Sequence, residues 1–166
     1  MKDIFENPNS IYEAAGNLVS DMFVYIHGGQ EVLPTVVSLD AELKPSYVRL
    51  VAASGADIEN EKSKLTTQEG DENGRALVYF GGITLDGVER TCIIADIIEY
   101  SSNTGFMMIV PFEIQSGPES FKIFKFKLSA VKNMDADERG MRMNLFYDGV
   151  EGHPKGVELY ARYFSE

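Results

Sequence analysis

The dipeptide Asp86-Gly87 is the feature that most constrains how this chain can fold. It stands between two β-rich runs, Ala76 to Leu85 and Val88 to Tyr100, and the first run is interrupted by Gly81-Gly82. Asp-Gly between such runs is typical of a tight hairpin, because the central residues of that turn need positive φ angles. The sequence therefore predicts an antiparallel pair of strands here.

The second of these runs also fits another periodicity. Ile93, Ile94, Ile97 and Ile98 would lie on one face of a helix as well as in a buried strand. The preceding hairpin signal, the following turn residues and the β preference of Ile favour the strand. We keep the helix over 92–100 as the open alternative.

Further strands are expected from short runs rich in Val, Ile, Tyr and Phe that are separated by turn residues. The short turns, including Asn103 to Gly105 and Ser116 to Glu119, make neighbouring strands antiparallel. The expected strands are Phe23 to Ile26, Thr35 to Leu39, Tyr47 to Ala53, Phe106 to Ile114, Phe121 to Leu128, Met141 to Tyr147 and Val157 to Phe164.

A helix is expected at the N-terminal end, over residues 10–22. Ser10 and Glu13 have the spacing of a capping box, and apolar residues then recur at steps of three and four. Such a helix has one apolar stripe to bury. The predicted fold class is therefore α+β, an N-terminal helix packed on a mostly antiparallel, twisted sheet of about six to eight strands.

Residues 55–74 are the most polar stretch, and we expect them to form an exposed, mobile acidic loop. The 166 residues are otherwise apolar enough for one folded domain spanning 1–166. Cys92 is the single cysteine, so the chain can form no internal disulfide, which favours a reducing, cytoplasmic location. Acidic residues near the N-terminus and the absence of a long apolar run indicate a soluble chain without a signal peptide or membrane span.

The charge pattern limits the classes of partner. The net charge of -11 disfavours general nucleic-acid binding and anionic membrane surfaces, and it fits a protein partner that is basic. The oligomeric state is left open, with a homodimer among the alternatives. Phosphate-binding glycine loops are absent, and the Asp135 to Gly140 segment lacks the ligands of a complete calcium loop, so we expect no cofactor and no metal.

Four residues are weak catalytic candidates. His27 and His153 are the two histidines, and each stands beside turn residues, where we expect an exposed imidazole. Asp96 lies within Ile-Ile-Ala-Asp-Ile-Ile, where burial would raise its pKa, and with Glu99 and Arg90 it could form an acid-base site. Cys92 has apolar neighbours and is expected to be a buried structural residue.

Two further sets are binding candidates. Arg49, Arg90, Tyr79 and Tyr100 could supply polar groups if the sheet curves around a small ligand. An interaction surface could comprise a basic set, Lys122, Lys125 and Lys127, and an acidic set, Asp57, Glu59 and Glu61. In the basic segment Phe124, Phe126 and Leu128 would share one strand face and enter the core, while Lys125 and Lys127 protect an edge.

The function expected by elimination is non-enzymatic. An acidic binding or adaptor protein of the chaperone, inhibitor or assembly-factor type, acting through protein contacts, agrees best with the missing catalytic motifs. A pocket protein for a small ligand is the first alternative, and a small enzyme using carboxylates and histidine is the second.

Overall fold

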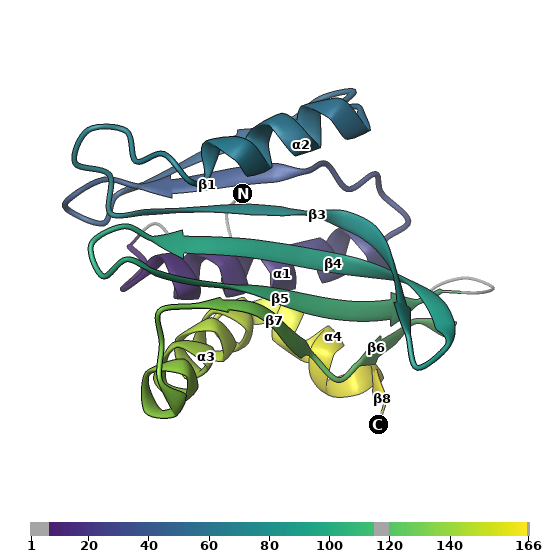
Figure 1. Cartoon of the computed structure of the whole chain (residues 1–166). Coiled ribbons are helices and arrows are strands. Elements are labelled where there is room, and N and C mark those ends of the chain that lie inside the picture. The colour runs from purple at the N-terminus through teal and green to yellow at the C-terminus, as the bar shows by residue number, and fades with distance from the viewer. Residues whose placement is uncertain (1–6, 115–119, 166) are drawn as a thin grey trace.

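The computed structural model describes residues 7–114 and 120–165, which form an α+β fold (Figure 1). Helix α1 covers one face of an eight-stranded, mostly antiparallel sheet, as the sequence predicts. The expected turn at Ser116 to Glu119 lies outside the described residues. In the part of the chain that is described, no helix is long and apolar enough to cross a bilayer.

The strands follow the order β2-β1-β3-β4-β5-β6-β8, and β7 also pairs with β5. Every pairing is antiparallel except that of β6 with β8. The bounds are β1 Thr35–Leu39, β2 Pro45–Arg49, β3 Gly74–Leu85, β4 Val88–Glu99, β5 Thr104–Glu113, β6 Lys122–Phe124, β7 Lys127–Lys132 and β8 Phe164–Ser165.

The predicted hairpin is confirmed. Asp86 and Gly87 have φ angles of 52° and 80°, and Leu85 pairs with Val88 across the turn. The isoleucine run is strand β4, not a helix, and it lies between β3 and β5 in the middle of the sheet. A central strand buried on both faces accommodates adjacent isoleucines, which explains why the run does not alternate with polar residues.

Helix α1 begins as predicted and ends later, spanning Ile11–His27. The Ser10 side chain accepts the Glu13 amide, while the Glu13 carboxylate accepts the Asn9 amide instead of that of Ser10. The expected strand at Phe23 to Ile26 is wrong, because Phe23 and Ile26 continue the buried stripe of the helix. The helix ends at Gly28-Gly29, where Gly29 has a positive φ.

The last two expected strands are also wrong. Met141 to Tyr147 lies in helix α3, Ala136–Glu151, and Val157 to Phe164 lies mostly in helix α4, Pro154–Tyr163. Gly149 lies inside α3 and is buried. Its face of α3 meets α1 so closely that a Cβ there would collide with the Glu13 carbonyl oxygen. Gly149 thus allows α3 and α1 to cross at close range.

The expected loop at 55–74 contains helix α2, Gly55–Lys64. Ser54 and Asp57 form a reciprocal capping box, with Asp in the place usually taken by Glu or Gln. The helix buries none of its own residues, which explains why its composition resembles that of a loop. In Figure 1 it runs along the upper margin of the sheet, above β1.

The sheet has apolar clusters on both faces. One face packs against α1 and, beyond it, against Phe146 and Val150 of α3. The other face, which we call the front face, carries a smaller cluster that includes Leu77, Ile94 and Ile109. Figure 1 shows α1 behind the central strands, with α3 and α4 along the lower margin. The front face is therefore the side on which these helices leave the sheet open.

The bounds of β3, β4 and β5 differ from the expected ones by one or two residues, and two other expected strands differ by more. Strand β2 ends at Arg49, and Ala52 takes a positive φ in the following turn. The Phe121 to Leu128 run is divided into β6 and β7 at Lys125-Phe126, and the stretch of β5 between the flanking pairs contains Pro111. Proline has no N–H to donate to a neighbouring strand, so it favours an interruption of pairing. This interruption, which we call the strand break, shapes the candidate site.

Candidate functional site

A groove of about 430 Å³ lies where the tip of the β3–β4 hairpin faces the strand break. We call it the hairpin groove. Its apolar lining comes from both ends of the hairpin turn, from β5 and from the strand break. These residues are Leu85, Val88, Pro111, Phe124 and Phe126. Pro111 and Phe126 are buried, whereas half of Val88 is exposed, so the apolar lining reaches from the core to the surface.

Arg90 of β4 forms a fixed wall of the groove. Its Nη1 donates to Glu113 Oε2 at 3.1 Å, and its Cζ lies 4.0 Å from the centroid of the Phe124 ring. The ion pair orients the guanidinium edge, and the aromatic ring supports its face. The charge of Arg90 is therefore compensated inside the protein.

Lys125 and Lys127 bring two further positive charges to the groove. Both side chains are exposed, and within residues 7–114 and 120–165 neither forms an ion pair or a side-chain hydrogen bond. Lys125 lines the groove from the strand break, and Lys127 lines it from the first position of β7. The lining also contains one acidic side chain, the exposed Asp86 of the hairpin turn, so three basic side chains and one acidic side chain stand beside the apolar surface. In a chain with 26 acidic and 15 basic residues, this local excess of positive charge is a distinct electrostatic environment.

In the basic segment, the structure differs from the prediction in which side chains enter the core. Phe126 enters the core shared with α1 and α3, as expected. Phe124 instead packs against Arg90 and remains half-buried in the groove. A regular strand would place both rings on one face, and the break separates them. Lys122, the third member of the basic set, is exposed on β6 and does not line the groove.

His153 is not exposed as expected, because only 1% of its surface is accessible. Its Nδ1 accepts the Gly156 backbone N–H at 3.0 Å, which caps α4. Its Nε2 lies 3.0 Å from Asp21 Oδ1. Since both ring nitrogens are engaged inside the protein, this imidazole has no free position for proton transfer to a substrate.

His27 lies near the end of α1 in an aromatic cluster. Its Nε2 lies 3.3 Å from the Tyr163 hydroxyl, and its ring packs against Phe121 and Tyr163. His153 instead contacts Asp21, which precedes His27 in α1 by nearly two turns. The two histidines therefore serve separate contacts between α1 and α4.

Asp96 and Glu99 lie on opposite sides of the sheet. Asp96 is flanked by Leu77 and Met107, which belong to the front-face cluster. Glu99 Oε1 accepts a hydrogen bond from Arg142 Nη2 of α3 at 3.5 Å, on the face of the sheet that the helices cover. The structure does not bring them together, and Arg90 lies at the other end of β4.

Asp96 is nonetheless an unusual carboxyl group. Burial raises its pKa, and the nearby Lys62 ammonium offsets part of that effect. Lys62 lies 5.0 Å above the Tyr79 ring and donates to Glu59 at 3.2 Å. Asp96, Lys62 and Tyr79 thus form a small polar group on the front face, outside the lining of the hairpin groove.

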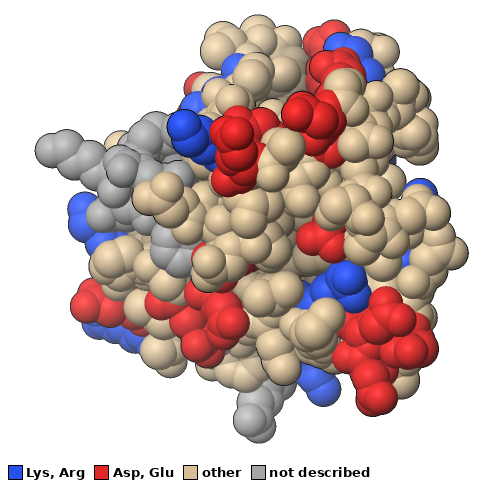
Figure 2. All heavy atoms as spheres, turned by 90° about the vertical axis from the view of Figure 1, so that its left-hand side faces the viewer, with Lys and Arg blue, Asp and Glu red and all other residues tan. Residues whose placement is uncertain are grey.

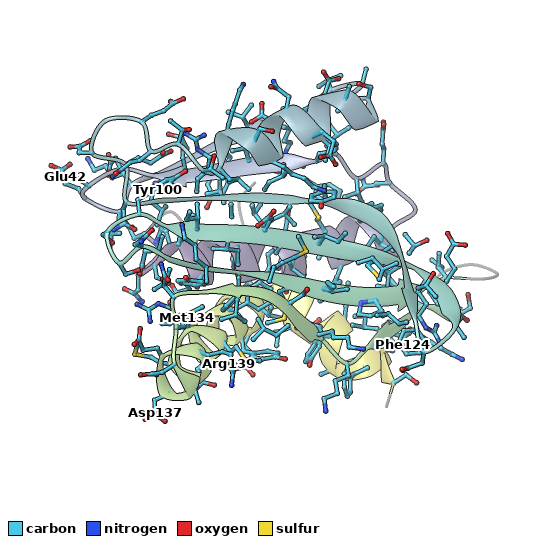
Figure 3. All side chains as sticks on the ribbon, viewed as in Figure 1. Glu42, Tyr100, Phe124, Met134, Asp137 and Arg139 are labelled. Atoms are coloured by element: carbon cyan, nitrogen blue, oxygen red, sulfur yellow. The ribbon has the colours of Figure 1, made fainter. Side chains whose placement is uncertain are left out.

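The four ligand-binding candidates do not converge. Arg49 pairs with Asp21 at 3.4 Å on the α1 side, and the Tyr100 hydroxyl donates to the Leu65 carbonyl at 2.7 Å. Tyr79 contacts Lys62, so only Arg90 lines the groove. Figure 3 shows Tyr100 and Phe124 at opposite ends of the sheet.

The acidic candidates on α2 are mostly engaged within the helix. Asp57 forms the capping box, Glu59 pairs with Lys62, and Glu61 pairs with Lys64. Figure 2 shows the end of the molecule away from the hairpin groove, where acidic side chains stand in several groups separated by uncharged surface. The described residues contain no group of three or more His, Cys, Asp or Glu side chains placed to hold a metal ion.

Cys92 is buried, and burial raises the pKa of its thiol. It lies on β4 opposite Pro111. A buried thiol of raised pKa has little thiolate, so the residue is a structural component of the sheet.

Sequence reasoning identified Arg90, Lys125 and Lys127 separately and did not place them in one groove. The available signal was Pro111, a proline inside an apolar strand, which indicates interrupted pairing in the neighbouring strand. Comparison of the chain with protein-family models, curated proteins and solved structures finds no match.

Proposed function

We propose that this chain is a non-enzymatic binding protein that holds a small ligand in the hairpin groove. The observation that carries the proposal is an apolar groove with two lysines at its surface, Lys125 and Lys127, that form no ion pair with any described residue. Apolar lining with a few convergent polar groups is the usual composition of small-molecule sites. The groove provides both.

The size of the groove supports a small ligand. Its volume of about 430 Å³ falls within the range of roughly 300–1,000 Å³ that is common for small-molecule sites. We therefore assign the groove to a small molecule. The protein partner expected from the sequence stays a separate prediction, for which the internally paired acids of α2 give no added support.

The positions of the catalytic candidates support a binding role. His153 is engaged at both nitrogens, and Asp96 and Glu99 are separated by the sheet. The described lining of the groove contains neither histidine nor Cys92, and its one carboxylate, Asp86, is exposed at the hairpin turn. Acid-base catalysis needs such groups within hydrogen-bonding reach of one substrate.

A small-molecule screen on the full chain tests this function. We expect saturable hits that protect the amides of residues 85–90 and 124–127 from hydrogen exchange and are not turned over. Val88→Trp, which fills the groove, should weaken these hits by about tenfold or more. Val48→Trp is the matched control, since Val48 is 55% exposed and Val88 50% exposed.

Two results would contradict the proposal. One is a screen in which every saturable hit protects amides elsewhere and is insensitive to Val88→Trp. The other is conversion of a hit into a product at a rate that follows the concentration of the protein.

A further inference from the structure

We infer that the ligand of the hairpin groove is a small amphiphilic anion, an anionic group on an apolar alkyl or aryl body, and that Lys125 and Lys127 hold its charge. This inference rests on the proposed function and names the chemical class of the ligand. It combines three properties of the groove: an excess of basic side chains (Arg90, Lys125 and Lys127 against Asp86), an apolar lining and a limited volume.

The positive charge available to a ligand comes from the lysines. The Arg90 guanidinium is already paired with Glu113 and stacked on Phe124. Lys125 and Lys127 have no such partners in the described chain. Flexible ammonium groups can approach a carboxylate or a phosphate from several directions, and each contact is a charge-assisted hydrogen bond.

Edge protection alone does not account for Lys125. Lysines that protect a sheet stand beside an unpaired strand. Strand β6, which ends next to Lys125, is paired on both sides, with β5 through Ile123 and with β8 through Phe124. Lys125 stands in the strand break that follows this paired strand, and it lines the groove.

The ligand also needs an apolar body. An exposed ammonium and a hydrated anion gain little from each other in water. Burial of apolar surface against Val88, Phe124 and Phe126 adds roughly 25 cal/mol for each Å² removed from water. A nucleic acid is disfavoured because the net charge of -11 repels a polyanion at longer range.

The test uses four probes with one decyl chain and different head groups: decanoate, decyl phosphate, decanol and decyltrimethylammonium. Binding is measured by calorimetry on the full chain below the micellar concentration, at low and high salt. We expect the two anions to bind at least about tenfold more tightly than decanol, the equivalent of one charge-assisted hydrogen bond. The relative affinities of decanoate and decyl phosphate then distinguish a carboxylate ligand from a phosphate ligand.

The variant Lys125→Gln/Lys127→Gln should lose this preference while it still binds decanol. Lys122→Gln/Lys132→Gln is the matched control, because it removes the same charge from β6 and β7 outside the described groove lining. We expect the control to keep the preference, which should also decrease at high salt.

The outcomes separate the two proposals. Decanol or the cationic probe binding as tightly as the anions overturns the inference and leaves the proposed function standing. Inorganic phosphate, or an acidic peptide without an alkyl group, binding more tightly than decanoate also overturns the inference. If no probe protects the groove and the library screen is negative too, the proposed function fails as well.

Discussion

His153 links helix α4 to helix α1 through Asp21. Its Nε2 lies 3.0 Å from Asp21 Oδ1, and its Nδ1 accepts the Gly156 amide at 3.0 Å. Because Nδ1 is an acceptor, the ring proton of the neutral form lies on Nε2 and is donated to the carboxylate. The other oxygen of Asp21 lies 3.4 Å from Arg49 on β2. One buried histidine thus joins the C-terminal helix, the N-terminal helix and the sheet.

Replacing His153 should therefore reduce stability. His153→Ala removes a helix cap and leaves Asp21 short of one donor, so we expect the free energy of unfolding to fall by about 2–4 kcal/mol. His153→Asn should lose less, since Asn can still cap α4. Urea denaturation measures both. Equal losses for the two variants would show that capping contributes nothing.

Two glycines of α3 should respond in opposite directions to the same substitution. Gly149→Ala would drive a Cβ into the Glu13 carbonyl of α1, and we expect a loss of about 3 kcal/mol or separation of the helices. Gly140→Ala meets nothing within 4 Å and should stabilise the helix by about 1 kcal/mol. Thermal unfolding of both variants tests the crossing. A neutral Gly149→Ala would contradict the close approach.

Asp96→Asn should raise stability at neutral pH. Burial raises the pKa of Asp96 above its ordinary value of 3.8, so the folded chain holds this proton at a higher pH than the unfolded chain does. Protonation therefore favours the fold, and the wild type gains stability as the pH falls through the folded pKa toward the unfolded one. The advantage of the Asn variant should shrink over that interval.

Urea unfolding between neutral pH and about pH 4 measures this difference. The exposed Asp71→Asn variant controls for the loss of one carboxylate. An advantage of Asp96→Asn that stays constant across the whole range would contradict the assigned direction of the pKa shift.

Cys92 should be unreactive in the folded protein. It is fully buried, and burial raises the pKa of its thiol, so both access and thiolate are limiting. We expect Ellman's reagent to label it only after the addition of denaturant, and faster in Gly149→Ala than in the wild type because that variant opens more often. Prompt labelling of the native wild type would place the thiol at the surface.

Much of the local structure could be predicted from the sequence. Asp86-Gly87 specified the hairpin, because few residue pairs tolerate two positive φ angles, and Ser10 specified the start of α1, because its hydroxyl caps a free amide. The strand Thr35 to Leu39 was predicted with its observed bounds. These features depend on neighbours in the chain, which a sequence displays directly.

Helices α3 and α2 were predicted wrongly because neither has a clear apolar pattern in its own sequence. Met141 to Tyr147 has too few apolar residues in phase to distinguish a strand from a half-exposed helix, and α3 obtains its stability from packing on α1. Helix α2 buries none of its residues, so its sequence carries no apolar stripe that would indicate a helix. The capping pair Ser54 and Asp57 was the signal from which this helix could have been predicted.

By itself, the sequence determined the α+β class, the hairpin, the first helix cap and the chemical character of each candidate residue. Only the tertiary structure decided which of those residues meet. It separated Asp96 from Glu99 by the thickness of a sheet, enclosed His153 between two helices, and brought Arg90, Lys125 and Lys127 to one groove. The physical reason is that turns and caps depend on contacts a few residues apart, whereas a binding site depends on register and packing between segments that are distant in the chain.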